Sequence, residues 1–250
     1  MVDSEYSEES DWFAEWFDSP YYHLLYDHRD ELEAQGFLDR LINHFQWKQG
    51  TRMMDLACGK GRHAIHLNQR GMLVTGLDLS KNSIDSVRHL NSDSLHFQVW
   101  DMREPYGEGG YEVILNLFTS FGYFQDLSDN VKALKAMRSV LADGGVIVMD
   151  YLNVIPVLDT LPSDGRIQKG KVQFQTRKFL EDGSIKKHIR IEDDAFKGEY
   201  TESVQALMLE DFKGLFDRAG LTLTEVFGDY SLKSFKEESS PRLIMVLETI

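Results

Sequence analysis

Three acidic residues follow three predicted strands of this chain, each in a position to bind a polar ligand. Asp55 precedes a short turn that contains Gly59 and Gly61, Asp78 ends the apolar run 73–78, and Asp101 follows the apolar run 95–100. Glycines allow the backbone to turn sharply and a ligand to approach it closely. An acid at the end of the second strand can accept hydrogen bonds from ribose hydroxyls. This pattern predicts a nucleoside-binding α/β site.

Two classes of nucleoside cofactor compete for this turn. Residues 59–64 satisfy the dinucleotide fingerprint G-x-G-x-x-G/A, but Asp55 at the mouth of the turn would repel a pyrophosphate, which binds at a helix N-terminus. S-adenosylmethionine carries no phosphate, and its sulfonium and amino groups are cationic. Asp101 and Met102 could bind an adenine amino group and cover its ring. The acids therefore favour the methyl donor over NAD.

Residues 53–80 closely resemble the glycine-rich motif and the ribose-binding acid of class I S-adenosylmethionine-dependent methyltransferases of the small-molecule type. The likeness extends to residues 111–116 and 141–150, spans about residues 38–150 and resumes near Leu209. Ala57 stands where the family has its first motif glycine, a small replacement that should tolerate the same turn. The resemblance implies an α/β fold: a doubly wound, seven-stranded, mostly parallel, Rossmann-like sheet whose last strand is antiparallel. After the fifth strand the alternation of strand and helix breaks, which predicts an antiparallel β insertion there.

The resemblance also implies a site for S-adenosylmethionine, with S-adenosylhomocysteine as the product. Tyr21 is expected as an aromatic lid, Arg29 as a clamp on the methionine carboxylate, and Asn116 near the methionine end. The complete set of expected cofactor-binding residues is Tyr21, Arg29, Asp55, Ala57, Cys58, Gly59, Gly61, Asp78, Leu79, Asp101, Met102 and Asn116. No metal ligand is predicted. No catalytic base is assigned, because nothing ranks the candidates His23, His28, Tyr123 and Tyr151.

Composition narrows the function. The chain has 27 Lys and Arg against 41 Asp and Glu, a net charge of −14, which disfavours a nucleic-acid partner. Cys58 is the single cysteine, so an internal disulfide is excluded. Neither a signal-like leader nor an apolar run of about 18 residues is visible, so we expect a cytoplasmic protein without a membrane partner.

The chain divides into three predicted parts: residues 1–30 as an aromatic-rich cap, residues 31–151 and 209–250 as the methyltransferase domain, and residues 152–208 as the insertion. Periodicity predicts helices at 31–45, 130–141 and 209–219. Residues 172–180 and 185–191 read as a hairpin with an Asp-Gly turn, followed by a strand within 199–208. Strands at 222–227 and 243–248 should pair antiparallel, the last of them at the sheet edge.

The predicted hairpin is basic in an acidic protein, with eight Lys or Arg and two acids in residues 166–190. Its basic face could be solvated, or it could be a lid that binds a carboxylate or phosphate of the substrate. The candidate substrate residues are Tyr123, Tyr151, Arg177 and Arg190.

Residues 116–124 are rich in aromatics and lack the proline pair of base-modifying DNA methyltransferases, which disfavours adenine or cytosine as the acceptor. The aromatics could be a pocket wall or core. We therefore expect in-line methyl transfer to an oxygen or nitrogen of a small molecule. An aminosugar N-methyltransferase acting on a nucleotide-linked sugar, a non-catalytic cofactor-binding module and a basic peptide substrate stay open. The oligomeric state is not predicted.

Overall fold

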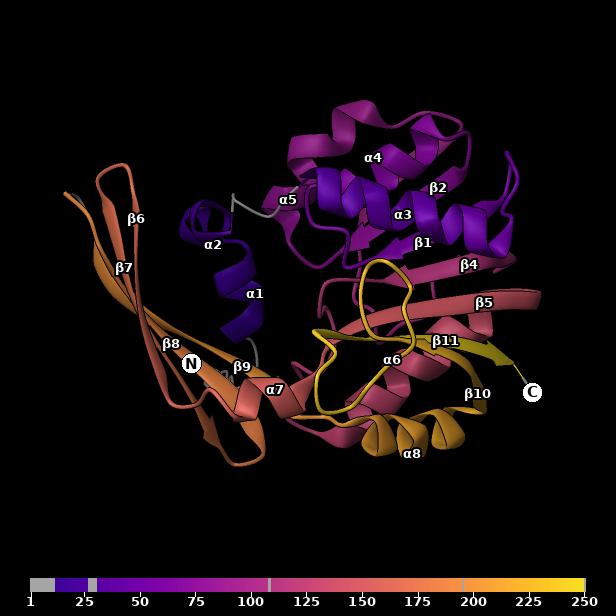
Figure 1. Ribbon diagram of the computed structural model, residues 1–250. Coiled ribbons are helices and arrows are strands. Elements are labelled where there is room, and N and C mark those ends of the chain that lie inside the picture. The colour runs from indigo at the N-terminus through magenta and orange to yellow at the C-terminus, as the bar shows by residue number, and fades with distance from the viewer. Residues whose placement is uncertain (1–11, 27–30, 108, 195, 250) are drawn as a thin grey trace, which may run out of the picture.

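The computed structural model describes residues 12–26, 31–107, 109–194 and 196–249. Two separate sheets organise them, a seven-stranded sheet and a four-stranded sheet, with two short helices between the two (Figure 1).

The larger sheet has the strand order β3-β2-β1-β4-β5-β11-β10, and only β11 runs antiparallel to its neighbours. This confirms the predicted fold class. The strands are β1 (Arg52–Leu56), β2 (Leu73–Asp78), β3 (Leu95–Val99), β4 (Tyr111–Asn116), β5 (Leu141–Leu152), β10 (Leu221–Phe227) and β11 (Arg242–Thr249). The predicted place of the last strand was wrong: β11 lies between β5 and β10, so β10 is the edge. Five consecutive buried residues, 243–247, explain this, because a strand that is apolar on both faces belongs inside a sheet.

Helices cover both faces of this sheet (Figure 1). On one face lie α3 (Glu31–Phe45), α4 (Arg62–Gln69), α5 (Lys81–Val87) and the short 3₁₀ turn Arg88–Leu90, and on the other lie α6 (Leu127–Val140) and α8 (Leu209–Ala219). Each face has its own apolar cluster, built around Phe37 and Leu67 on the first and around Leu134 and Phe212 on the second. The strand order reverses between β1 and β4, and at such a point a crevice opens outside the carboxyl ends of the strands.

The predicted helix ends differ from the observed ones only at α6. Helices α3 and α8 have the predicted bounds, and Gly220 ends α8 in a left-handed conformation with φ 71°. Helix α6 begins at Leu127 instead of Asn130, because the side chain of Asp126 accepts a hydrogen bond from the backbone N–H of Ser128 and so caps the helix earlier.

The insertion forms an antiparallel meander of β6 (Ser163–Lys169), β7 (Val172–Glu181), β8 (Ser184–Glu192) and β9 (Lys197–Gln205), preceded by α7 (Val154–Leu158). Asp182 and Gly183 both have positive φ, 50° and 71°, as a two-residue hairpin turn requires. Neither β6 nor α7 was predicted. The sequence of β6 is polar and contains a glycine, so pairing with β7 defines it and its side chains do not.

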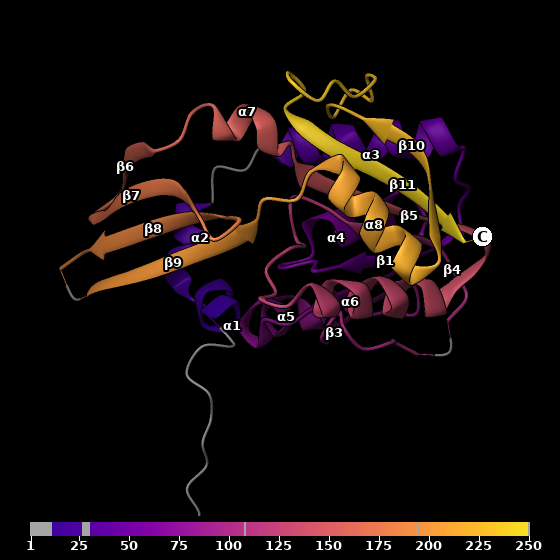
Figure 2. The same cartoon turned by 90° about the horizontal axis from the view of Figure 1, so that it is seen from below.

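Helices α1 (Trp12–Phe17) and α2 (Pro20–Leu25) pack against the apolar face of the insertion sheet (Figure 2). We call residues 12–26 the cap. Trp16 and Leu25 are fully buried there, in a cluster with Phe174 and Ile189. The indole N–H of Trp16 also donates to Glu202 Oε1 at 2.7 Å. The cap is therefore joined to the insertion by apolar and polar contacts.

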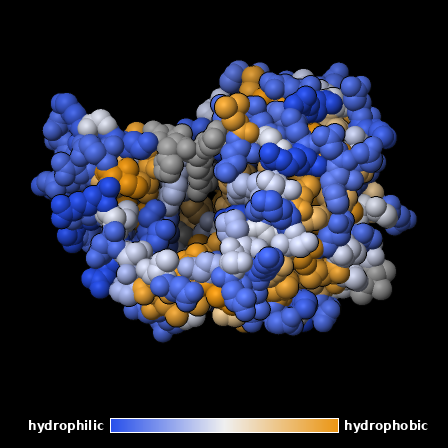
Figure 3. Space-filling view, in the orientation of Figure 1, coloured by the Kyte–Doolittle hydropathy of each residue, from blue (hydrophilic) through white to orange (hydrophobic). Residues whose placement is uncertain are grey.

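Arg177 and Arg190 lie on the opposite face of the insertion sheet, whereas Lys187 lies on the cap-facing side, where its Nζ is 2.6 Å from the phenol oxygen of Tyr26. Arg177 pairs across the strands with His188, and Gln175 with Arg190. Arg190 Nε donates to Glu199 Oε1 of β9 at 2.7 Å. Hydrophilic residues cover much of the visible surface of the insertion, and a recess separates it from the larger body (Figure 3).

Candidate functional site

A cavity of about 880 Å³ lies at the carboxyl ends of the first four strands, under the cap. Three groups of residues line it: the glycine-rich turn with the ends of β2 and β3, the loop after β4, and the cap. The lining residues include Phe13, Phe17, Tyr22, His23, Tyr26, Ala57, Cys58, Gly59, Asp78, Leu79, Ser80, Asp101, Met102, Phe118, Tyr123 and Phe124. The site is thus built from segments more than one hundred residues apart in the sequence.

The glycine-rich turn brings backbone N–H groups to the second strand. Gly59 has φ 55°, and its N–H donates to Asp78 Oδ2 at 2.7 Å, while the N–H of Ser80 donates to Asp78 Oδ1 at 2.8 Å. Gly61, with φ 71°, lies so close to Phe97 that an added Cβ would be 2.5 Å from its ring. Burial raises the pKa of Asp78, and these two N–H donors oppose that rise. The carboxylate is fixed in place at the cavity wall.

Asp55 lies beneath the turn and is not among the residues that line the cavity. Its Oδ2 accepts a hydrogen bond from the N–H of Ala64 at 3.1 Å, and its Oδ1 is 4.0 Å from His63 Nδ1. The side chain is 1% exposed, and burial raises its pKa to about 7. Asp55 therefore holds the start of α4 from beneath the turn.

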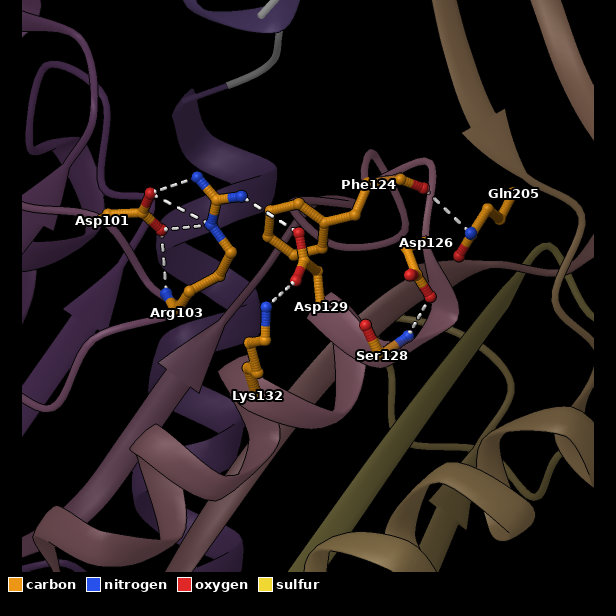
Figure 4. Close-up of polar contacts among 8 residues, drawn as sticks. All are labelled: Asp101, Arg103, Phe124, Asp126, Ser128, Asp129, Lys132 and Gln205. Carbon is orange, nitrogen blue, oxygen red and sulfur yellow. Dashed lines mark hydrogen bonds and ion pairs between the residues drawn. The ribbon is translucent and has the colours of Figure 1, made fainter. Parts of the chain in front are cut away.

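Asp101 is held by an arginine that was not predicted (Figure 4). Arg103 Nη2 lies 2.6 Å from Asp101 Oδ2, and Arg103 Nε lies 3.1 Å from both carboxylate oxygens. The same guanidinium donates to Asp129 of α6 at 3.1 Å and lies 5.1 Å from the centre of the Phe124 ring. Burial raises the pKa of Asp101, but the bonds from Arg103 outweigh it and hold the pKa below its ordinary value. Asp101 stays a carboxylate, fixed by Arg103.

The loop after β4 is held from behind by a buried ion pair. Arg242 Nε donates to Asp150 Oδ1 at 2.7 Å, and the N–H of Phe118 donates to Asp150 Oδ2 at 2.8 Å. Phe118 and Thr119 have φ 58° and 59°, a left-handed conformation that costs free energy for such side chains. Arg242 Nη2 also donates to Thr119 Oγ1 at 2.9 Å. The ion pair thus maintains the strained backbone that places Phe118 in the cavity wall.

Asn116 is buried at the end of β4. Its Nδ2 donates to the carbonyls of Leu56 and Ser120, at 3.2 and 3.3 Å, and both of these residues line the cavity. In the part of the chain that the structure describes, its Oδ1 has no hydrogen-bond partner. A buried acceptor without a partner is costly, so a ligand donor here would be favoured.

The cap lines the cavity with Tyr22 and not with Tyr21, the residue that was expected there. Tyr21 does not line it: the phenol donates to Asp193 at 2.8 Å, and the ring stacks on Phe196 of the insertion, with centroids 4.8 Å apart. Tyr22 on the adjacent side of α2 lines the cavity instead. Arg29 lies outside the described residues. The spacing of Phe13 with Phe17 and of Tyr22 with Tyr26, one helical turn each, is the signal that could have found this wall.

The four expected substrate residues are not brought together. Tyr123 lines the cavity, and its ring centroid lies 5.1 Å from that of Phe17. Tyr151 is 1% exposed behind the wall and donates to the carbonyl of Gln205 at 2.6 Å. Arg177 and Arg190 lie on the outer face of the insertion sheet, because its apolar face is the one that packs on the cap. Neither arginine is among the residues that line this cavity.

The described residues contain no cluster of His, Cys, Asp and Glu with the arrangement of a metal site. Among them there is also no helix that is both long and apolar enough to cross a membrane.

Fold and cavity together define a doubly wound α/β protein with a nucleoside-sized site at its topological switch point. The sequence matches the methyltransferase domain family over residues 47–206. The chain belongs to the class I S-adenosylmethionine-dependent methyltransferases.

Individual relatives agree with this assignment. YqeM of Bacillus subtilis (strain 168), which is named as a methyltransferase, is 29% identical over 145 residues, 51% of this chain and 59% of that protein. This chain thus covers less than two thirds of that relative. A solved S-adenosylmethionine-dependent methyltransferase from Clostridium acetobutylicum has a TM-score of 0.76 at 19% identity, covering 95% and 97% of the two chains. The sugar N-methyltransferase KedS8 from Streptoalloteichus has a TM-score of 0.70 at 20% identity, covering 90% and 92%. At these identities the two structures support the fold alone.

The residues of the cavity fit S-adenosylmethionine, the cofactor of this family. An added Cβ at Gly59 would meet nothing within 4 Å, so the turn leaves space on its ligand side. Asp78 and Asp101 present carboxylates at two strand ends. Asn116 is not among the lining residues, but its buried Oδ1 has no hydrogen-bond partner in the described part of the chain.

Proposed function

We propose that this protein transfers a methyl group from S-adenosylmethionine to an oxygen or nitrogen of a small molecule. One observation carries the proposal: a single cavity joins the carboxylate-bearing wall of the glycine-rich turn to an aromatic wall made by the cap and the loop after β4. The first wall suits a nucleoside with cationic groups. The second suits an apolar or ring-shaped acceptor, because aromatic side chains bury large areas and bind cations on their faces.

Four side chains would bind the donor. Asp78 accepts hydrogen bonds from the ribose hydroxyls, Asp101 binds at the adenine end with Met102 beside it, and Asn116 accepts from the amino group at the methionine end. When bound, S-adenosylmethionine supplies a methyl group on a sulfonium, which an aligned lone pair can displace. The protein then has mainly to orient the acceptor and exclude water, and proximity alone can contribute roughly 7–11 kcal/mol.

His23 is the cavity residue best suited to accept a proton from the acceptor. Burial, followed by the charge of Lys60, lowers its pKa below the ordinary histidine value, so the imidazole is neutral at pH 7. Its Nε2 lies 3.5 Å from Ser83 Oγ. We propose His23 as a candidate general base for acceptors that must lose a proton, a step that contributes about 10²–10⁴-fold.

We also propose that the chain works as three parts: the cap, the methyltransferase domain and the insertion. The insertion has a structural role in this proposal, because it holds the outer side of the cap while the inner side lines the cavity. The compartment, like the acceptor, is a proposal: we expect the cytoplasm.

Two measurements test the proposal. Calorimetry should show binding of S-adenosylmethionine and S-adenosylhomocysteine, and no binding of NAD. A panel of small amines, hydroxy compounds and nucleotide-linked aminosugars should then contain an acceptor that drives formation of S-adenosylhomocysteine. Binding of the donor without turnover on any acceptor would favour a non-catalytic module, and binding of NAD alone would refute the assignment of the site.

A further inference from the structure

Asp18, between α1 and α2, ties the cap to the segment that follows Asp78. Its Oδ1 accepts hydrogen bonds from Ser80 Oγ at 2.6 Å and from the backbone N–H of Asn82 at 2.9 Å. Its Oδ2 accepts from Asn82 Nδ2 at 2.6 Å. These partners are 62 and 64 positions away in the sequence. One carboxylate of the cap therefore makes three hydrogen bonds to the methyltransferase domain.

The same segment positions the proposed ribose acid. The N–H of Ser80 donates to Asp78 Oδ1 at 2.8 Å, and the N–H of Gly59 donates to Asp78 Oδ2 at 2.7 Å. Ser80 is buried, so its position is well defined. The charge of Asp18 is one of the influences that raise the pKa of Asp78, after burial. Asp18 is thus linked to Asp78 through one serine, although Asp18 does not line the cavity.

The neighbours of Asp18 in the cap are the residues that close the cavity. Phe17 directly precedes it and Tyr22 lies four residues after it, and both line the cavity. Their rings lie 5.0 Å apart, and Phe17 also meets Tyr123 of the loop after β4. If the cap moved away from Ser80 and Asn82, this aromatic wall would leave with it.

We infer that Asp18 is a positioning residue that holds the cap over the ribose end of the donor site. This inference rests on the proposed function, because it takes S-adenosylmethionine as the ligand. When a ligand binds only the closed form of a site, the apparent Kd equals the intrinsic Kd divided by the fraction of molecules that are closed. A larger closed fraction therefore gives tighter apparent binding. Asp18 increases that fraction through Ser80 and Asn82, so donor affinity depends on a residue that does not touch the donor.

The test measures the Kd of S-adenosylhomocysteine by calorimetry and its dissociation rate by stopped flow. Asp18→Ala removes the three bonds, and Asn82→Asp places two carboxylates face to face. Each should raise the Kd about tenfold, the lower range for hydrogen bonds to a charged group. The swapped pair Asp18→Asn with Asn82→Asp restores one amide and one carboxylate and should recover most of the affinity. Asp85→Ala is the matched control. Asp85 lies on α5 together with Asn82, but it pairs with Lys81 and Arg88 and makes no bond to Asp18.

A second readout separates positioning from general stability. Hydrogen exchange in the presence of S-adenosylhomocysteine should be faster across residues 12–26 in Asp18→Ala than in wild type, with unchanged exchange in the strands of the large sheet. Equal Kd and equal cap protection in wild type and in both single variants would overturn the inference alone. A wild-type protein that binds neither S-adenosylmethionine nor S-adenosylhomocysteine would overturn the proposed function together with it. If Asp18→Ala does not fold, the surface variant Asn82→Asp and the swapped pair decide the outcome.

Discussion

Arg242→Met should reveal how much the buried ion pair behind the loop after β4 contributes to stability. The side chain of Asp150 is 0% exposed, and that of Arg242 is 19% exposed. Removing the guanidinium leaves a buried carboxylate without its counter-ion, which typically costs 3–5 kcal/mol. Asp150 would keep hydrogen bonds from the N–H of Phe118 at 2.8 Å and from the phenol of Tyr230 at 3.1 Å. We therefore expect a loss of about 3 kcal/mol.

Urea unfolding of wild type and variant measures this loss from the shift in midpoint at constant slope. The double variant Asp150→Asn with Arg242→Met should lose less than the sum of the two single variants, because the unpaired charge is gone. Arg190→Ala is the control: its ion pair with Glu199 is exposed and should contribute no more than about 1 kcal/mol. A loss below about 1 kcal/mol for Arg242→Met would refute the reasoning and show that Asp150 is stabilised by its other hydrogen bonds.

The same variant tests the link from the ion pair to the cavity. Phe118 and Thr119 keep their left-handed conformation only while the surrounding contacts outweigh its cost. Without Arg242, Thr119 Oγ1 loses a donor and the loop should relax. We expect weaker binding of S-adenosylhomocysteine in the folded variant, measured by calorimetry.

The remaining predictions concern acids and the basic face. Asp78→Ala should leave the fold intact and weaken donor binding by roughly 2–4 kcal/mol, since two ribose hydroxyls lose a charged acceptor; unchanged affinity in calorimetry would place the ribose elsewhere. Burial raises the pKa of Asp55 from 3.8 to about 7, so ionising it opposes folding, and its contribution to stability is lost as the pH rises between these values. Asp55→Asn should abolish that decline in urea unfolding at a series of pH values, and an identical profile would contradict it. Arg177→Ala with Arg190→Ala should change neither the donor Kd nor the acceptor KM and should alter stability by no more than about 0.5 kcal/mol; a raised KM would show that the outer face does meet the substrate.

Deleting the cap would be a poor test of its role over the cavity. Trp16 and Leu25 fill the apolar face of the insertion sheet, so a truncation before Glu31 would expose that cluster. We therefore expect such a truncation to destabilise the insertion. Substitutions such as Asp18→Ala act on the position of the cap without removing its packing.

Local sequence patterns predicted those turns and helices whose geometry depends only on residues adjacent in the sequence. The spacing of Gly59, Gly61 and Asp78 predicted a turn and an acid at adjacent strand ends, because backbone sterics and strand direction alone set these positions. The apolar period of α3 and the terminal Gly220 of α8 likewise predicted both helices correctly.

Tertiary structure decided which faces meet. Alternation correctly separated Arg177 and Arg190 from Phe174 and Ile189, but only the packing of the cap shows that the apolar face turns inward. The physical reason is that an apolar sheet face is stabilised when other residues cover it, while a charged face can stay in water.

The sequence also did not predict which side chains far apart along the chain contact each other. Tyr21 and Tyr22 are indistinguishable by type, and the angle at which α2 docks sends one to Asp193 and the other to the cavity. Likewise, the sequence determined that Asp101 follows a strand, and only the fold brought Arg103 together with Asp129 around it. Local periodicity assigns a side chain to a face of its own element. Which other element contacts this face depends on how the whole chain buries its apolar surface. Those contacts therefore exist only in the folded protein and cannot be read from local periodicity.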